Sequence, residues 1–312
     1  MSTLICGSLA YDTIMVYPGR FKEQILPEQL HILNVSFLVP EMRREFGGCA
    51  GNIAYNLHML GGSAVIMAAI GLADGAPYLA RLDALKLSRR HIREIDGAFT
   101  GQAFIMTDMD DNQITAFHPG AMGESHRNHV GDATGVSLGI VAPDGRDGMM
   151  SHAKQFAENG IPFIFDPGQG MPMFSGPELL NFVDQAAYVA VNDYEAKMLQ
   201  DKTGKTIEEL AHKKQALIVT LGAQGAEIYA DGQRHVIPSV IAQKVQDPTG
   251  CGDAFRGGLL YGMAQGMDWP TTGRLASLMG SLKIAERGAQ NHVHTREEIG
   301  QRFFEAFGNR VW

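Results

Sequence analysis

The sequence contains few cysteines, few tryptophans and no surplus of basic residues. Its 312 residues include three cysteines and two tryptophans. Cys6, Cys49 and Cys251 lie far apart, without the CxxC pair of a zinc or redox site, so we expect a reduced, cytoplasmic compartment. Asp and Glu outnumber Lys and Arg by 34 to 26, which gives a formal charge of −8. This acidic excess predicts small-molecule ligands and argues against a nucleic acid or an anionic membrane as partner.

Long apolar runs are missing as well. The longest, AVIMAAIGLA at residues 64–73, is too short to span a bilayer. The first residues, MSTLICGSLAYD, enter a strand-like run without a basic region before it, so no signal peptide is predicted. The eleven histidines form no HExxH motif, and we interpret HVH at residues 292–294 as a solvated turn. No repeat or linker divides the chain, which predicts one domain over residues 1–312.

Short apolar runs alternate with helix-like segments along the chain. Their continuous Ile- and Val-rich composition is typical of strands that are buried on both faces. The alternation predicts an α/β fold in which helices cover both faces of a mostly parallel sheet. In such folds ligands bind beyond the carboxyl ends of the strands. The predicted strands are TLICG, AVIMAAIG, GIVA, PFIFD, AYVAVN and ALIVTLG.

Two segments, residues 12–46 and 101–118, interrupt this alternation. Residues 101–118 have β-prone arms joined by the turn-forming DMDDNQ, which predicts a hairpin. The first segment contains a strand candidate, HILNVSFLV, at residues 31–39. We predict that the two segments form a small sheet that projects from the main domain.

The stretch DPTGCGDAFRGG, residues 247–258, combines glycines and aspartates ahead of an apolar helix-like run. Gly250 and Gly252 allow close approach to a ligand, and a helix beginning near Asp253 would point its free amides at the loop. This arrangement predicts an anion site. Asp253 is compatible with two roles, an N-cap or a base that accepts a proton from an attacking alcohol.

Four further motifs end predicted strands or begin helices. FGGCAGNIAYNLHMLGG places a di-glycine before Asn52, as either a capped turn or a polar ligand site. VNDYE places Asn192 and Glu195 in one helical turn, where they form a capping box or contact Mg²⁺ and phosphate through water. VTLGAQGA, residues 219–226, is a glycine-rich turn after a strand, and GSLAYD places Asp12 where it could grip a vicinal diol.

These stretches, in this order, resemble the ribokinase-like carbohydrate kinase family, whose members phosphorylate sugar or nucleoside hydroxyls with ATP. FGGCAGN is similar to the first family signature and DPTGCGDAFRGG to the second, and the resemblance covers essentially the whole chain. Within the family, FHPGAM, VNDYE and DPTGCGDAFR look most like bacterial adenosine kinase. The resemblance implies a three-layer α/β/α domain with a small β-sheet lid. It also implies transfer of phosphate from ATP to the 5′-hydroxyl of adenosine, a purine salvage reaction.

The resemblance also implies roles for single residues. Asp253 would be the general base, and the amides of Gly250, Cys251 and Gly252 would hold charge on the transferred phosphoryl group. Phe104 and Phe117 would sandwich the purine, unless they only pack the lid. The implied nucleoside contacts are Ser8, Asp12, Ser36, Gly48, Asn52, Phe104, Phe117 and Gln169. The implied ATP contacts are Asn192, Thr220, Gly222, Gly225, Arg256 and Ser277.

Two cations follow from the resemblance. Glu195 would organise Mg²⁺ through water, and Asp247 lies where many relatives hold a monovalent cation, so K⁺ activation is compatible with the sequence. Arg256 would reach an ATP phosphate or form a surface ion pair. The edge of the small sheet would join two subunits into a homodimer.

Two positions depart from the family pattern. Cys251 fills a position that holds another small residue in many relatives, and a thiol at a helix N-terminus can have a lowered pKa, so its modification could block the anion site. Met173 stands where a related enzyme carries a basic residue, which leaves the acceptor open. The alternatives are a kinase for a free sugar, inosine or guanosine, and a nucleoside-binding protein without catalysis.

Overall fold

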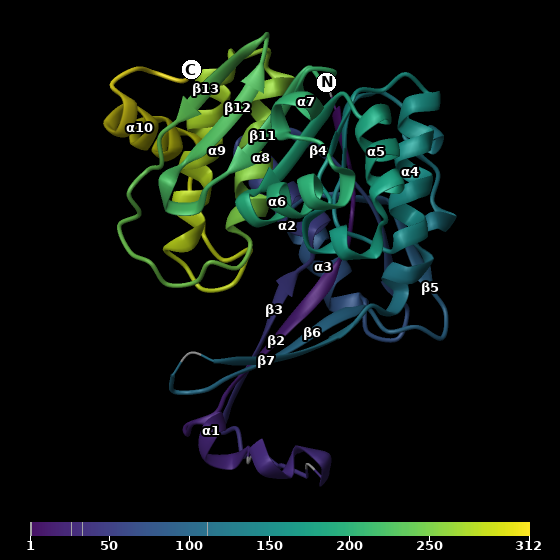
Figure 1. The fold of residues 1–312 in the computed structure, drawn as a ribbon, viewed down its shortest axis with the longest axis vertical. Coiled ribbons are helices and arrows are strands. Elements are labelled where there is room, and N and C mark those ends of the chain that lie inside the picture. The colour runs from purple at the N-terminus through teal and green to yellow at the C-terminus, as the bar shows by residue number, and fades with distance from the viewer. Residues whose placement is uncertain (1, 26, 33, 111) are drawn as a thin grey trace.

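The computed structural model describes residues 2–25, 27–32, 34–110 and 112–312. In this part of the chain a nine-stranded sheet forms the body of the molecule and a second sheet of four strands projects from it (Figure 1). The pairs between neighbouring strands of the large sheet are parallel except at one edge, where β11, β12 and β13 pair antiparallel. In order across the large sheet, the strands are β13 (Gln233–Ile237), β12 (Ala226–Ala230), β11 (Ala216–Thr220), β10 (Tyr188–Asn192), β9 (Phe163–Phe165), β8 (Val136–Val141), β1 (Ser2–Cys6), β4 (Ser63–Gly71) and β5 (Ser88–Ile95).

Helices cover both faces of the large sheet, which confirms the predicted three-layer fold (Figure 1). One face packs against α2 (Cys49–Met59), α8 (Cys251–Ala264) and α9 (Trp269–Ile284), and α10 (Arg296–Phe307) packs on α9. The other face packs against α4 (Arg146–Glu158), α6 (Asp193–Thr203) and α7 (Ile207–Ala211), with α5 (Gly176–Gln185) beside α4 and α6. The remaining helices are α1 (Phe21–Gln24), α3 (Ala76–Ala84), η1 (Pro27–Ile32), η2 (Gly120–Arg127), η3 (Val130–Asp132), η4 (Gly168–Met173) and η5 (Gly222–Gln224).

Each face of the large sheet has its own apolar core. Within β1, Ile5 packs on the α2–α8 side, and its neighbours Leu4 and Cys6 pack on the α4–α5 side. Alternate residues of a strand point to opposite faces, so a strand buried on both faces needs apolar side chains at every position. The uninterrupted apolar runs in the sequence have this physical origin.

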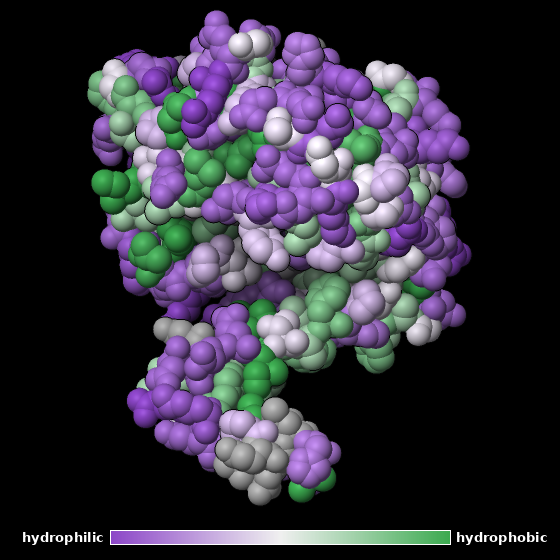
Figure 2. Space-filling view, in the orientation of Figure 1, coloured by the Kyte–Doolittle hydropathy of each residue, from purple (hydrophilic) through white to green (hydrophobic). Residues whose placement is uncertain are grey.

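The small sheet consists of strands from both segments that interrupt the alternation. Its order is β3 (Glu41–Gly47), β2 (Ala10–Val16), β6 (Gly101–Thr107) and β7 (Gln113–His118), and β6 and β7 form the predicted hairpin. Leu26, Leu33 and Asp111, which also belong to the predicted segments, lie outside the described residues. Figure 2 shows a hollow between the body and this projection, with apolar side chains on its wall.

The strand predicted at residues 31–39 is wrong. His31 and Ile32 belong to η1, and residues 34–39 have no regular structure. The strand in this region is β3, which follows at Glu41–Gly47 and pairs along its whole length with β2. The mostly polar sequence EMRREFG obscured it, because a strand with an exposed face does not need apolar residues at every position.

No helix in the described ranges is long and apolar enough to cross a membrane.

Candidate active site

The anion loop, residues 250–253, consists of the N-cap and the first three residues of helix α8. Gly250 is the N-cap with φ of 79°, a left-handed conformation that favours glycine, and a Cβ there would lie 2.7 Å from the Cβ of Ala289. The amide of Cys251 donates to the carbonyl of Pro248 at 3.2 Å. Of the three amides predicted to hold phosphoryl charge, that of Cys251 is therefore engaged, while those of Gly250 and Gly252 carry no backbone hydrogen bond among the described residues. The positive end of α8 and these two amides are therefore the groups available for the predicted anion site.

Asp253 lies in the first turn of α8 and does not cap it, so the N-cap alternative is wrong. Its Oδ2 accepts a hydrogen bond of 2.8 Å from Nδ2 of Asn52 in the first turn of α2. Burial raises the pKa of Asp253 to about 7, and the charge of Asp166 adds to this rise, while Asn52 and Arg256 oppose it. A carboxylate with this pKa can both hold and release a proton near neutral pH, as a general base must.

Arg256, one turn after Asp253, forms a buried ion pair with Asp166. Its Nε and Nη2 donate to the two carboxylate oxygens of Asp166 at 3.1 and 3.0 Å. Arg256 is 4% exposed, so the surface-pair alternative is wrong, and its contact with ATP stays a prediction. The bidentate pair fixes the guanidinium of Arg256 and its positive charge behind the anion loop. Nη1 of Arg256 lies 4.0 Å from the position that a Cβ on Gly252 would take.

Asn192 and Glu195 form a complete capping box at the start of α6. The Asn192 side chain accepts from the Glu195 amide, and both carboxylate oxygens of Glu195 accept from Asn192. Burial raises the pKa of Glu195, and the charge of Asp166 adds to the rise. Capping fixes these side chains at the carboxyl end of β10, beside Asp166 and Arg256. Their contact with Mg²⁺ stays a prediction.

A cavity of about 500 Å³ opens beside the anion loop. It brings together four of the predicted ATP contacts, Thr220, Gly222, Gly225 and Ser277, with Cys251 and Gly252 of the loop. Val240, Ile241, Val245 and Ile284 supply apolar walls. The volume and the apolar lining suit a nucleotide base, and the polar end meets the anion loop.

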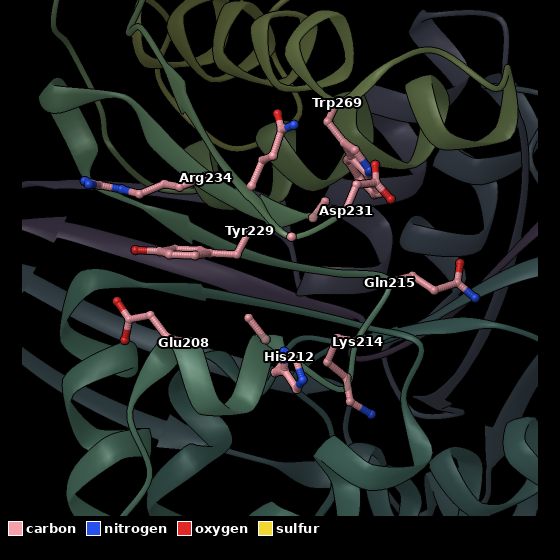
Figure 3. Close-up of a pocket in the computed structure, with 12 residues that line it drawn as sticks. Glu208, His212, Lys214, Gln215, Tyr229, Asp231, Arg234 and Trp269 are labelled. Atoms are coloured by element: carbon pink, nitrogen blue, oxygen red, sulfur yellow. The ribbon is translucent and has the colours of Figure 1, made fainter.

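A second cavity, of about 720 Å³, lies at the opposite ends of the strands (Figure 3). Tyr229, Arg234 and Trp269 line it together with Gln215, which precedes β11, and Asp231, in the turn after β12. This end of the sheet is the amino end of β11, whereas the anion loop and Thr220 lie at the carboxyl end. The second cavity therefore does not belong to the site.

Asp12 and the turn after β3 form the side of the site nearest the small sheet. Burial raises the pKa of Asp12 to about 6, and Asp247 and Glu45 add to the rise. Gly48 has φ of 85°, and a Cβ there would lie 2.6 Å from the Ala10 amide nitrogen and from the Ser8 carbonyl oxygen. The hydroxyl of Ser8 accepts from the amide of Cys49 at 3.1 Å. Ser8 thus holds the start of α2, and its contact with a nucleoside stays a prediction.

Phe104 and Phe117 lie on opposite faces of the small sheet. Phe117 is paired with Ala103, and Phe104 with Ala116. Paired residues share a face of the sheet and consecutive residues do not. The predicted purine sandwich is therefore wrong within a single chain, because the two rings lie on opposite faces. Since Asp12 is also paired with Ala103, Phe117 shares the face of Asp12, and Phe104 lies on the other.

The other predicted acceptor contacts lie in exposed segments. Ser36 is exposed in the irregular stretch of residues 34–39, and Gln169 is exposed within η4. Met173 ends η4, and its carbonyl accepts from Nε of Arg146 at 3.4 Å, so a basic group is present near Met173 although it comes from another element. The roles of Ser36 and Gln169 stay predictions.

The structure contradicts two expectations about the residues around the loop. Burial raises the pKa of Cys251 to about 11, so its thiol is protonated at neutral pH and the expected lowering is wrong. His292 of the HVH motif is buried and its Nε2 contacts Oδ1 of Asn56 at 2.8 Å, whereas Val293 is exposed, so the solvated-turn expectation is wrong for His292 only.

Sequence reasoning missed three residues that organise the site. Asp166 pairs with Arg256; Gln290 donates from Nε2 to Oδ1 of Asn52 at 3.0 Å; Lys283 donates to the carbonyl of Asp247 at 2.7 Å. Asp166 stands directly after the predicted strand PFIF, and a polar residue at a carboxyl strand end was the available signal. Gln290 and Lys283 had no local signal.

This geometry, an anion loop with a partly buried carboxylate beside a nucleotide-sized cavity, defines a phosphotransferase of the ribokinase-like fold. The model of the pfkB family carbohydrate kinases matches residues 8–296, and the chain belongs to that family.

Among the proteins to which the chain is similar are two nucleoside kinases that align over nearly its whole length. A nucleoside kinase of Burkholderia thailandensis, solved in complex with inosine, is 57% identical with a TM-score of 0.91, covering 99% of each chain. The same protein has also been solved in complex with ADP-inosine. A nucleoside kinase of Methanocaldococcus jannaschii is 29% identical over 307 residues, 97% of each chain.

Proposed function

We propose that the protein transfers phosphate from ATP to the 5′-hydroxyl of purine nucleosides, with inosine and adenosine both as acceptors. The observation that carries the proposal is Asp253, a partly buried carboxylate with a pKa of about 7 at the junction of the anion loop and Asn52. The inosine complex of the Burkholderia relative supports a nucleoside acceptor and broadens the adenosine expectation.

Asp253 takes the proton from the acceptor. Its Oδ2 is held by Asn52, the thiol of Cys49 is a weak donor to the carboxylate, and the other carboxylate oxygen has no nitrogen or oxygen donor among the described residues. That oxygen accepts the 5′-hydroxyl proton while the alkoxide oxygen attacks the γ-phosphorus and the bond to the β-phosphate oxygen breaks. The hydrogen bond from Asn52 stabilises the ionised form of the base and fixes its direction.

The anion loop holds the negative charge of the transferred group. The amides of Gly250 and Gly252 and the positive end of α8 face the place where charge develops, and Arg256 adds a fixed positive charge behind them. Magnesium, when bound with ATP, neutralises phosphate charge. No group of three or more His, Cys, Asp or Glu in the described ranges is arranged to hold a metal, which fits an ion held largely by phosphate oxygens and water. Asn192 and Glu195 would hold that hydrated ion.

The small sheet supplies the acceptor side and acts as a lid over it. Asp12 would accept hydrogen bonds from the ribose hydroxyls, and Phe117, on the same face, would stack on the purine. Phe117 is 50% exposed, so its ring is accessible for stacking. Closure of the lid over the nucleoside would exclude water, a competing acceptor.

The exposed edge of the small sheet also supports a homodimer. β7 is an edge strand with exposed side chains at every position, and unpaired edges invite a partner. Light scattering on the purified chain tests this; a monomer over the working concentration range would contradict it.

A coupled ADP-release assay with inosine, adenosine, guanosine and ribose tests the acceptor, and identification of the product separates transfer from ATP hydrolysis. We expect kcat/KM for inosine and adenosine to exceed that for ribose by at least tenfold, because ribose lacks the purine that Phe117 stacks on. Higher kcat/KM with ribose would overturn the nucleoside assignment. ADP release without a phosphorylated acceptor would overturn the transfer itself.

A further inference from the structure

Lys283 is a completely buried lysine, 0% exposed, in the last turn of α9. Its ammonium donates to the backbone carbonyl of Asp247 at 2.7 Å and to that of Glu286 at 2.9 Å. Removing an ammonium from water is costly, and burial lowers the pKa of Lys283, an effect that the charge of Asp247 opposes. A buried charge of this kind needs compensating groups, and here they are oxygens at the entrance to the anion loop.

Asp247 is the centre of this cluster. Its Oδ1 accepts from the Thr249 amide and its Oδ2 from the Gly288 amide, both at 2.9 Å. Burial would raise the pKa of Asp247, but these two amides and the charge of Lys283 outweigh it and hold the pKa below its ordinary value. All three oxygens of Asp247 therefore have partners within the protein. These residues do not fit the monovalent cation expected at Asp247, because the ammonium of Lys283 already occupies the Asp247 carbonyl oxygen that such a cation would bind.

Lys283 also connects the segments around the anion loop. The carbonyl of Asp247 precedes Gly250 by three residues, and the thiol of Cys251 lies 3.9 Å from that same oxygen. The carbonyl of Glu286 belongs to the turn that leads to Gly288 and Ala289, and Ala289 packs against Gly250. One positive charge thus joins the two backbone segments whose positions set the conformation of the loop.

We propose that the ammonium of Lys283 is a built-in cation for the anion loop, which orders the loop and adds positive potential to it, so that phosphoryl transfer by this protein needs no bound monovalent metal ion. An ammonium and K⁺ carry the same charge and both bind carbonyl oxygens. A K⁺ ion at the carbonyl of Asp247 would stand against the positive charge of Lys283, so the two exclude each other.

The wild-type protein gives the first test. Initial rates are measured with KCl and with tetramethylammonium chloride at equal ionic strength, with Mg²⁺ and ATP held constant. We expect the two rates to agree within about twofold, because the cation site is already filled. A several-fold activation of the wild type by K⁺ would overturn the proposal.

The Lys283→Ala variant empties the site and gives the second test. We expect its kcat to fall about tenfold or more in tetramethylammonium, and K⁺ or NH₄⁺ to restore much of it. The same ions should raise its melting temperature by about 2 °C or more, and leave the wild type unchanged. The melting measurement needs no substrate, so it is independent of the proposed acceptor. Full kcat without K⁺, or a folded variant that responds to K⁺ in neither measurement, would contradict the proposal.

Two control variants separate the charge from the packing. Lys283→Met fills the cavity without a charge, and we expect it to lose activity that K⁺ does not restore. Lys202, whose ammonium donates to the carbonyl of Phe174 at 2.6 Å, is a lysine of similar geometry on α6. Lys202→Ala should lower the melting temperature with no K⁺ response. The Lys283→Ala variant could also fail to fold in tetramethylammonium. Recovery of folded variant on refolding in K⁺ would then support the proposal. Failure of the variant to fold in both salts, together with activation of the wild type by K⁺, would refute it.

Discussion

The anion loop and the small sheet, which the proposed function makes opposite walls of one site, are built differently. Around the loop, Arg256 and Asp247 are buried and Asp253 is partly buried, and all three make hydrogen bonds within the protein. The small sheet exposes Phe104, Ile114 and Phe117, and projects from the body (Figure 1). Groups that stabilise developing charge must be held in place in advance, whereas a surface that recognises an acceptor can complete its packing when the acceptor binds. In the function proposed above, this difference assigns the chemistry to the body and the choice of acceptor to the small sheet.

The largest effect should come from the base. For Asp253→Asn we expect kcat to fall about 10²- to 10⁴-fold, because the amide cannot accept the hydroxyl proton. Nucleoside affinity, measured by calorimetry, should change little, since the acceptor wall is intact. A near-normal kcat would show that the body does not carry the chemistry.

The buried ion pair should give the next effect, on stability. Arg256→Ala leaves the charge of Asp166 unpaired in the interior, at an expected cost of about 3–5 kcal/mol in the free energy of unfolding, measured with urea. Arg234, which pairs with Glu227 at the surface, is the matched control, and its replacement by Ala should cost about 0–1 kcal/mol. Equal costs would mean that the anion loop is no more preorganised than the surface.

The small sheet should respond in acceptor binding. Phe117→Ala should raise the KM for nucleoside about 5- to 100-fold, as the loss of one aromatic stack, with the KM for ATP unchanged. Phe104→Ala is the matched control, because Phe104 lies on the face away from Asp12 and should change the nucleoside KM by less than about twofold. If Phe104 has the larger effect, the assignment of the two faces is wrong.

The smallest effect should be a shift in pH dependence. The hydrogen bond from Asn52 lowers the pKa of Asp253, so Asn52→Ala should raise that pKa above about 7. Because the base works in its ionised form, the acid limb of the kcat/KM profile should move to higher pH, by about half a unit to one unit. Asn128→Ala, which removes the hydrogen bond of another buried Asn to the Ala68 carbonyl, should leave the limb in place. An unshifted limb in Asn52→Ala would mean that Asn52 does not tune the base.

The sequence predicted those features of the fold and the site that depend on residues close together in the chain. Runs such as AVIMAAIG and ALIVTLG became β4 and β11, because burial on both faces demands apolar residues at every position. The glycines of the anion loop and the capping box of Asn192 and Glu195 are likewise written within a few residues. The edge strand β5 was missed, since its sequence SRRHIREI is polar where it meets solvent.

Contacts between distant residues left no such signal. Asn52 and Asp253 are 201 positions apart, and Asp166 and Arg256 are 90 apart. The faces of Phe104 and Phe117 depend on strand register, which a shift of one residue would reverse. Tertiary packing also decides the pKa of Cys251, where burial outweighs the helix terminus that favoured a lowered value.

The chain is continuous from β3 to the residue that holds the base. β3 ends at Gly47, α2 begins at Cys49, and Asn52 lies in the first turn of α2. A displacement of the small sheet toward a bound nucleoside would therefore pull on the helical turn that donates to Asp253. Binding of the acceptor and the change in the proton affinity of Asp253 would then occur together. Asp253 would remain a weak base toward water until the correct hydroxyl is in place.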